Sequence, residues 1–190
     1  MAKVVSPGWP DEVSEEFNAE SPRALVILAA AMLDQALKRL LQTYLVASPT
    51  RDDDLFDGSN APMGHLSSRI DFSYRLGLIS NEMCRDLHLI RKIRNEFAHN
   101  ITNCTFENEK VKSRIFELRK SIPLFSNSKF QSIVDTDRKA FQTATGVIQV
   151  SLQSIANKTT PMKQQSLEWF YKITEPKKKK SKQGNEKESK

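Results

Sequence analysis

Apolar residues recur at helical spacing through residues 129–156, and this long amphipathic pattern most constrains what the chain can fold into. The pattern consists of Phe130, Ile133, Val134, Phe141, Ala144, Val147, Ile148, Leu152 and Ile155. A second long pattern follows Ser21 and Pro22, and it consists of Leu25, Leu28, Met32, Ala36 and Leu40 at helical spacing. Ser21 and Pro22 are typical of a helix start because serine caps free N–H groups and proline suits the first turn. The chain holds only 6 Gly and 8 Pro, so long helices are favoured over many short strands.

Shorter patterns divide the rest of the chain, and together they predict an all-α fold, a compact bundle of about five or six helices. Ser80 is the expected cap of a helix that ends near His99, and Gly77 is expected to end the helix before it. That earlier helix is expected to bury Leu66, Ile70 and Tyr74. The predicted helices cover residues 21–46, 64–76, 80–99, 108–120 and 129–156, with an arm or a short helix at 11–18 and a loop at 47–63.

Positive charge gathers at the C-terminal end of the chain. The net charge is +6, and residues 177–190 contain seven lysines and two glutamates, so the other 176 residues carry only +1. We therefore expect an N-terminal arm at 1–20, a helical domain at 21–175 and a disordered Lys-rich tail at 176–190. Trp169, Phe170 and Tyr171 are expected to pack as a patch just before this tail. The segment from Lys177 to Lys190 is either a solvated tail or a source of weak, non-specific nucleic-acid contacts.

The sequence predicts a cytoplasmic protein with no membrane span. The N-terminus lacks the apolar stretch of a signal peptide, and the longest apolar run is far shorter than the roughly 20 residues that a spanning helix needs. Cys84 and Cys104 are expected to be free thiols. There is no Gly-rich phosphate loop and no Cys or His cluster with metal-ligand spacing, and Asp52, Asp53 and Asp54 are expected to form a solvated loop. We predict neither a cofactor nor a metal.

One short string stands out as a candidate catalytic site: Arg94-Asn95-Glu96-Phe97-Ala98-His99. It resembles the signature of the HEPN superfamily, many of whose members are metal-independent endoribonucleases with the arginine and histidine in a cleft between two subunits. The resemblance implies catalytic roles for Arg94 and His99, with Asn95 and Glu96 in support. His99 would move a proton and Arg94 would stabilise the negative charge on phosphate.

The same string has a purely structural interpretation. Cations near the C-terminal end of a helix are stabilised by the helix dipole, and Arg94 could pair with Glu96 or Asp86 or lie at a dimer interface. On a straight helix, residues five positions apart point about 140° away from each other. Arg94 and His99 would therefore meet in one subunit only if the helix ended or bent near His99, whereas pairing across a dimer removes this requirement.

A wider resemblance covers residues 21–155 and is carried by three successive pieces of sequence. They are Leu55-Phe56-Asp57-Gly58, Pro62-Met63-Gly64-His65-Leu66-Ser67-Ser68-Arg69-Ile70 and Tyr74-Arg75-Leu76-Gly77-Leu78-Ile79. In this order they resemble the mannitol operon repressor family, in which the next helix also closes with an arginine followed five residues later by a histidine. The resemblance implies an all-helical regulator of sugar-alcohol uptake without a helix-turn-helix, and this chain also lacks a compact basic recognition helix.

Two hypotheses follow for the function. The first is a regulatory protein, a transcriptional repressor that acts through a protein partner rather than through a DNA-reading motif of its own. The alternative is a HEPN-type metal-independent endoribonuclease, a toxin or defence effector that cleaves RNA with Arg94 and His99. Both hypotheses include a homodimer, because the apolar helix faces are generous for so small a chain.

Overall fold

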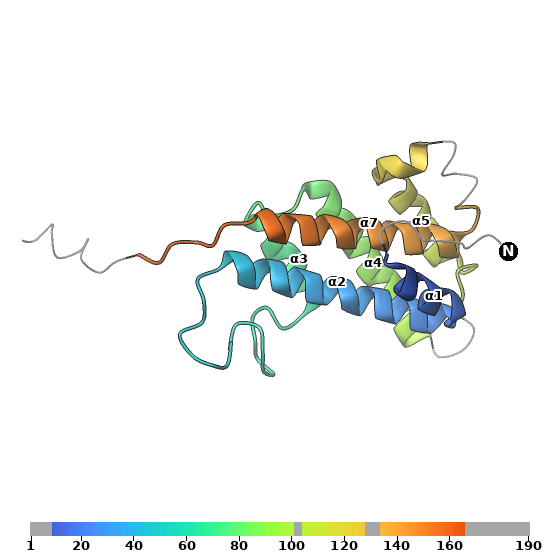
Figure 1. The fold of residues 1–190 in the computed structure, drawn as a ribbon. Coiled ribbons are helices and arrows are strands. Elements are labelled where there is room, and N and C mark those ends of the chain that lie inside the picture. The colour runs from blue at the N-terminus through green and yellow to red at the C-terminus, as the bar shows by residue number, and fades with distance from the viewer. Residues whose placement is uncertain (1–8, 101–103, 128–133, 166–190) are drawn as a thin grey trace, which may run out of the picture.

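The computed structural model describes residues 9–100, 104–127 and 134–165, and within these ranges the fold is all-helical with no strand (Figure 1). The predicted all-α bundle is therefore confirmed. These described residues form six α-helices and one 3-10 turn: α1 (Asp11–Ala19), α2 (Pro22–Tyr44), α3 (Leu66–Arg75), α4 (Asn81–His99), α5 (Glu109–Ser121), η1 (Pro123–Ser126) and α7 (Asp137–Lys158).

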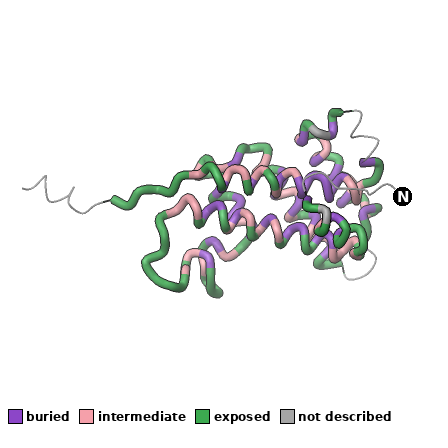
Figure 2. The backbone as a smooth tube through the Cα atoms, in the orientation of Figure 1, coloured by how far each residue is buried: buried purple, intermediate pink, exposed green. Residues whose placement is uncertain are grey.

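Helices α2 and α7 lie side by side and run in the same direction through the length of the molecule (Figure 1). Contacts at both ends fix this arrangement. Near the start of the pair, Arg138 donates to the backbone oxygen of Glu20 at 2.6 Å. Beyond their far ends, the N–H of Met162 donates to the oxygen of Tyr44 at 2.7 Å. The other helices pack around this pair, and the buried residues lie along its inner faces (Figure 2).

The predicted helix starts at Ser21 and Ser80 are confirmed. The Ser21 side chain accepts a hydrogen bond from the N–H of Ala24, and Ser80 accepts one from Met83, both at 3.2 Å. These bonds satisfy backbone donors that the first turn of a helix leaves free. Gly77, with φ of 72°, lies just beyond the end of α3 as predicted, because its positive φ lets the chain turn away from the helix axis.

The last long helix begins later than predicted. It starts at Asp137 rather than near residue 129, because the side chain of Thr136 caps it by accepting from the N–H of Lys139 at 3.3 Å. Val134 is buried, but it lies in the segment before the helix, where its oxygen accepts from Arg119 at 3.2 Å. The other predicted early members of the apolar pattern, Phe130 and Ile133, lie outside the described residues.

Two expectations about buried faces are wrong. Leu66 and Ile70 of α3 are buried as predicted, but Tyr74 is 40% exposed, because it lies in the last turn, where the chain is about to leave the helix axis at Gly77. In α2, Leu28 shares helical spacing with Leu25 yet is 38% exposed. The buried face of α2 is instead rotated toward Val26, Ala29, Ala30, Leu33, Leu37, Leu40 and Leu41.

The N-terminal segment packs onto the same core. Residues 11–19 form the short helix that was one of the two expectations for this segment. The indole N–H of Trp9 donates to the backbone oxygen of Gln142 in α7 at 3.0 Å, and its ring meets that of Phe17 edge-on. Trp9 and Phe17 are both buried, so these residues extend the core between α1 and α7.

The segment between α2 and α3 is the predicted loop, and buried Arg69 fixes it in place. The Arg69 side chain donates to the oxygen of Met63 at 2.8 Å and lies 2.7 Å from the carboxylate of Asp34 in α2. Phe56 and Met63 from the loop pack on Leu41 as a small second core.

Within the described residues, no helix is both long and apolar enough to cross a membrane. The predicted patch at 169–171 and the tail at 176–190 lie outside the described residues.

Candidate functional site

The candidate catalytic residues, Arg94 to His99, lie in the second half of helix α4. The side of this helix that faces the core determines where each of their side chains points. The helix runs without a break from Asn81 to His99. Ile93 and Phe97 face the core and are fully buried, so the residues between them lie on the flanks of the helix. Arg94, Asn95 and Glu96 are half-buried, whereas His99 is exposed in the last turn.

Glu96 is held by a neighbouring helix. Its carboxylate accepts from Arg114 of α5 at 3.0 Å and from the side-chain amide of Asn100 at 3.1 Å. The hydrogen bond from Arg114 is the main reason why the pKa of Glu96 lies below its usual value. Glu96 therefore joins α4 to α5 as an ion pair, and the expected pair between Glu96 and Arg94 is wrong.

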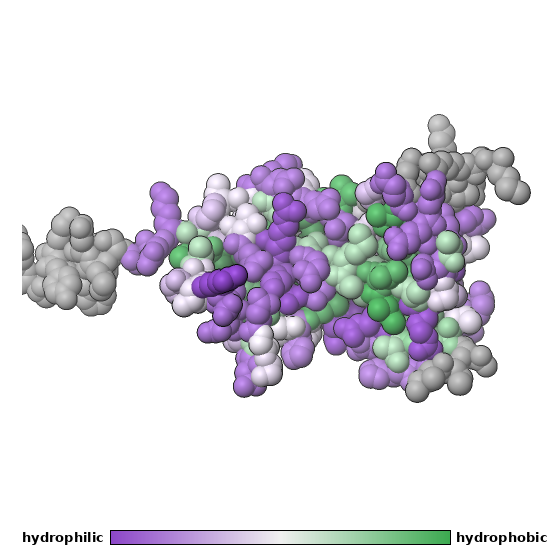
Figure 3. All heavy atoms as spheres, turned by 60° about the horizontal axis from the view of Figure 1, so that its bottom comes forward, coloured by the Kyte–Doolittle hydropathy of each residue, from purple (hydrophilic) through white to green (hydrophobic). Residues whose placement is uncertain are grey.

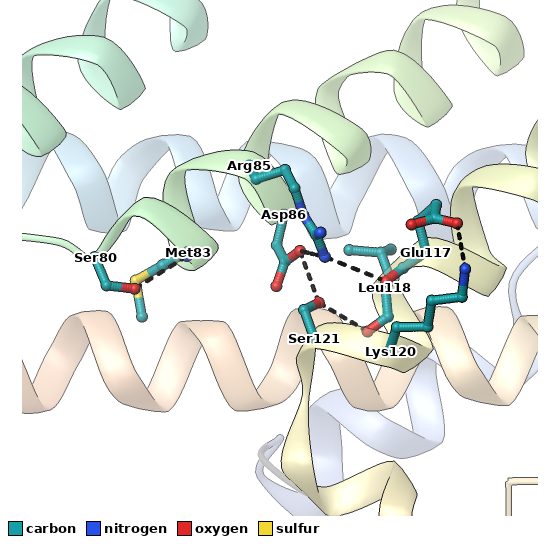
Figure 4. A network of polar contacts seen from close by, with 8 residues as sticks. All are labelled: Ser80, Met83, Arg85, Asp86, Glu117, Leu118, Lys120 and Ser121. Carbon is teal, nitrogen blue, oxygen red and sulfur yellow. Dashed lines mark hydrogen bonds and ion pairs between the residues drawn. The ribbon is translucent and has the colours of Figure 1, made fainter.

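Asp86 is also engaged by residues other than Arg94. Its carboxylate accepts from the Ser121 hydroxyl at 2.8 Å and from its neighbour Arg85 at 3.4 Å (Figure 4). Burial raises the pKa of Asp86, and these two hydrogen bonds oppose the increase. The expected pair between Asp86 and Arg94 is therefore wrong too, and the network in Figure 4 joins the first half of α4 to the end of α5.

Arg94 points toward α2 and lines a hollow of about 310 Å³, which we call the Arg94 hollow. Across it lies Asp34, whose carboxylate binds Arg69 through one oxygen and keeps the other oxygen buried without a hydrogen bond. Among the described residues, Arg94 itself has no hydrogen-bond or ion-pair partner. The hollow is lined by Ile27, Ala30, Ala31, Asp34, Gly64, His65, Leu66 and Arg94.

His99 is not among the residues that line the Arg94 hollow. The helix stays regular up to His99, so the offset of about 140° between the two side chains applies within one subunit. Asn100 ends the helix, and its backbone oxygen accepts from Arg23 at 2.5 Å. The structure thus does not bring Arg94 and His99 together in one hollow of a single chain. Their pairing across a dimer stays a prediction.

A second hollow lies between α2 and α7. This α2–α7 groove has a volume of about 460 Å³. Short side chains at Ala31, Ala36 and Ala156 leave room between the two helices. Its apolar floor is bordered by polar side chains, and the full lining is Ala31, Met32, Gln35, Ala36, Arg39, Gln149, Leu152, Gln153, Ala156 and Asn157.

Between the two hollows lies an exposed apolar strip, the α2 ridge, formed by Ile27, Leu28 and Ala31. Ala31 lines both hollows, so the ridge separates them. Figure 3 brings α2 forward and shows hydrophobic residues gathered in one patch over its N-terminal half, beside a hydrophilic region to the left. Helical periodicity predicts that Leu28 is buried, so the sequence analysis missed this ridge.

Four of the five basic residues of helix α5 pair with acidic neighbours, and Lys110 is the exception. Lys112 lies 2.7 Å from Glu107, and Lys120 lies 2.8 Å from Glu117. The two arginines, Arg114 and Arg119, pair with Glu96 and Asp137. The helix therefore presents little free positive charge to a DNA backbone.

Comparison with known proteins identifies the family. A profile of the mannitol repressor family, MtlR, matches residues 10–160, which is most of the chain. The chain belongs to the mannitol repressor family. It is 29% identical over 120 residues to the mannitol operon repressor of Escherichia coli strain K12 and, to the same extent, to that of strain O6:H1. Each alignment covers 58% of this chain and 58% of the relative, so the chain spans little more than half the length of these curated relatives.

A solved structure supports the family fold. The structure described as the MtlR–HPr complex from Escherichia coli contains a chain similar to this one, with a TM-score of 0.51 and 22% sequence identity. The similarity covers 77% of this chain and 96% of that chain. The resemblance to the mannitol repressor family is thus confirmed, whereas the HEPN resemblance and the catalytic roles of Arg94, Asn95, Glu96 and His99 stay predictions.

Proposed function

We propose that this member of the mannitol repressor family is a non-enzymatic transcriptional regulator that binds HPr through the α2 ridge. The single observation that carries the proposal is the exposed apolar ridge, flanked by a hollow on each side. The similarity to a chain solved with HPr supports the choice of partner, because it covers nearly all of that chain.

The composition of the α2 face suits a protein partner. Ile27 and Leu28 are 40% and 38% exposed, so two large apolar side chains lie at the surface of one helix. Polar residues lie further along α2, where Gln35 and Arg39 line the α2–α7 groove. An apolar centre with a polar rim is the usual anatomy of a protein interface. Arg94 adds a positive charge without an ion-pair partner among the described residues, and an acidic group of the partner could bind it.

Control of transcription would then run through the partner. All the basic residues of α5 except Lys110 are paired with carboxylates, so its exposed surface offers no strong DNA-binding stripe. The Lys-rich segment from Lys177 to Lys190 could add weak, non-specific contacts with nucleic acid. Mannitol enters this account only through the family, and the regulated operon is a separate question.

The test is calorimetric titration of the purified full-length chain with purified HPr of the same organism. We expect a 1:1 complex that Leu28→Glu weakens at least tenfold, because a buried charge at the centre of an interface is costly. Phe116→Glu is the matched control, since Phe116 lies on α5 and is 59% exposed. It should leave the affinity unchanged.

No binding by the wild-type chain, or an equal loss in both variants, would overturn the proposal. Sedimentation velocity on the same samples measures self-association, because a homodimer is also predicted. If Leu28→Glu dissociates a dimer while HPr binding is unaffected, the α2 ridge is the dimer interface and the proposed HPr site is wrong.

A further inference from the structure

Three side chains with metal-binding chemistry meet where α3 packs on α4. Cys84 and His88 lie one helical turn apart on α4, and Asp71 comes from α3. One donor atom of each residue lies within 4.8 Å of the other two. The closest pair is a ring nitrogen of His88, Nε2, and a carboxylate oxygen of Asp71, at 3.0 Å.

These separations suit a small tetrahedral ion. Zinc binds sulfur at about 2.3 Å and nitrogen or oxygen at about 2.0–2.2 Å, so its ligand atoms lie roughly 3.3–3.7 Å apart. The three donor atoms lie within 4.8 Å of one another, so side-chain rotations could bring them to these separations. Residues four positions apart share one helix face, so the backbone of α4 already directs Cys84 and His88 the same way.

The burial and hydrogen bonding of the three side chains also suit metal binding. Nε2 of His88 is the ring nitrogen that lies beside Asp71, and Nδ1 of the same ring is buried and has no hydrogen-bond partner. Cys84 is a free, half-buried thiol. The Asp71 side chain is 62% exposed, which leaves an open side where an ion can enter and where a water can complete four-coordination.

We propose that Asp71, Cys84 and His88 bind one Zn²⁺ ion between α3 and α4. A thiolate with an imidazole and a carboxylate favours zinc over magnesium or calcium, which prefer oxygen ligands alone. Binding releases the proton of the Cys84 thiol, because only the thiolate is a ligand. The ion joins α3 to α4, and the fourth position stays open to water.

The sequence alone indicates two of the three proposed zinc ligands. Cys84 and His88 are one turn apart in a predicted helix, but two ligands do not make a zinc site, and the third comes from a different helix. Only the packing of α3 on α4 brings Asp71 to them. The site uses neither the α2 ridge nor the Arg94 hollow, so it stands independently of the proposed partner.

The test is titration of the untagged, metal-free, full-length chain with Co²⁺, followed by displacement with Zn²⁺. We expect one equivalent of Co²⁺ to bind with a thiolate-to-cobalt absorption band, and Zn²⁺ to remove it. Cys84→Ser should abolish the band. Asp71→Asn and His88→Gln should weaken Zn²⁺ binding at least tenfold. Cys104→Ser is the control and should bind as the wild type does.

A thermal readout makes the test independent of folding defects in the Cys84 and His88 variants. Zn²⁺ should raise the Tm of the wild-type chain, because it binds the folded state alone. Asp71→Asn changes an exposed side chain and should fold normally, but Zn²⁺ should raise its Tm less than that of the wild type. Absence of the cobalt band, its persistence in Cys84→Ser, or an equal Tm response in Asp71→Asn would overturn the proposal.

Discussion

The structural role of Glu96, its ion pair with Arg114, can be tested through the stability of the protein. Its carboxylate and the Arg114 guanidinium are each about four-fifths buried, with side-chain exposures of 19% and 22%. We predict that Glu96→Gln lowers the free energy of unfolding by about 0.5–1 kcal/mol, the usual range for such a pair. Urea denaturation at pH 7 measures this loss. A change smaller than that of Glu117→Gln, whose Lys120 pair is more exposed, would contradict the structural role.

Asp86 makes a prediction about pH. Burial raises its pKa above the ordinary value of 3.8, so the folded chain binds this proton more tightly than the unfolded chain does. Ionisation therefore costs the wild type stability as the pH rises from 3.8 through the raised pKa. The variant has no carboxyl at this position and does not lose this stability. We therefore predict that the unfolding free energy of Asp86→Asn minus that of the wild type increases as the pH rises from 3.8 to the raised pKa, and that this difference stays constant at higher pH.

The control for this prediction has the opposite sign. Lys139 lowers the pKa of Asp135, so the wild type gains stability from Asp135 as the pH rises toward 3.8. The unfolding free energy of Asp135→Asn, relative to wild type, should therefore fall with pH below 3.8 and stay level above it. Denaturant titrations over a pH series measure both variants. A pH-independent difference for Asp86→Asn would contradict the assignment of a raised pKa.

The helix caps could be predicted from the sequence, whereas the hydrogen-bond and ion-pair partners between different helices could not. The caps at Ser21 and Ser80 each depend on a backbone N–H three residues away, so the sequence contains all that is needed. The partners of Glu96 and Asp86, and the hollow that Arg94 lines, depend instead on how α4 is rotated against α2 and α5. A rotation of one residue position, about 100°, is enough to exchange one set of partners for another.

At the scale of elements, α7 is the helix on which the core most depends. Phe141 is fully buried, and its ring lies 5.9 Å from that of Phe106. We predict that Phe141→Ala lowers the free energy of unfolding by about 3–5 kcal/mol through lost burial and the cavity it leaves. Phe116→Ala, on the surface of α5 under Lys120, should cost about 1 kcal/mol or less. Equal losses in the two variants would contradict the assigned core.

The existence of helices was predictable, but the start of α7 and the buried face of α2 were not. The apolar pattern at 129–156 continues through Val134, which is buried in the segment before the helix, so hydrophobic spacing could not locate the boundary. Leu28 and Leu25 have the same chemistry, and the packing of α2 against α7, α4 and α3 decides which of them is covered. The α2–α7 groove could not be predicted for the same reason, since it exists only between two packed helices.

At the scale of the whole molecule, the regulator and ribonuclease hypotheses differ in one simple assay. We predict that the purified chain leaves a mixed RNA pool intact in excess EDTA, because Arg94 and His99 do not share a hollow within one chain. The His99→Ala variant should behave identically. Cleavage that survives chelation and disappears in His99→Ala would establish a metal-independent nuclease and contradict the non-enzymatic account.

The central claim is that HPr binds the α2 ridge, and the most direct measurement is an NMR footprint. The ¹⁵N-labelled chain, at 21.7 kDa, is small enough for backbone spectra with and without unlabelled HPr. The account predicts shifted or broadened signals for Ile27, Leu28 and Ala31 and for the linings of the two flanking hollows. An unchanged spectrum, or changes confined to α5 and the end of α4 at His99, would contradict it.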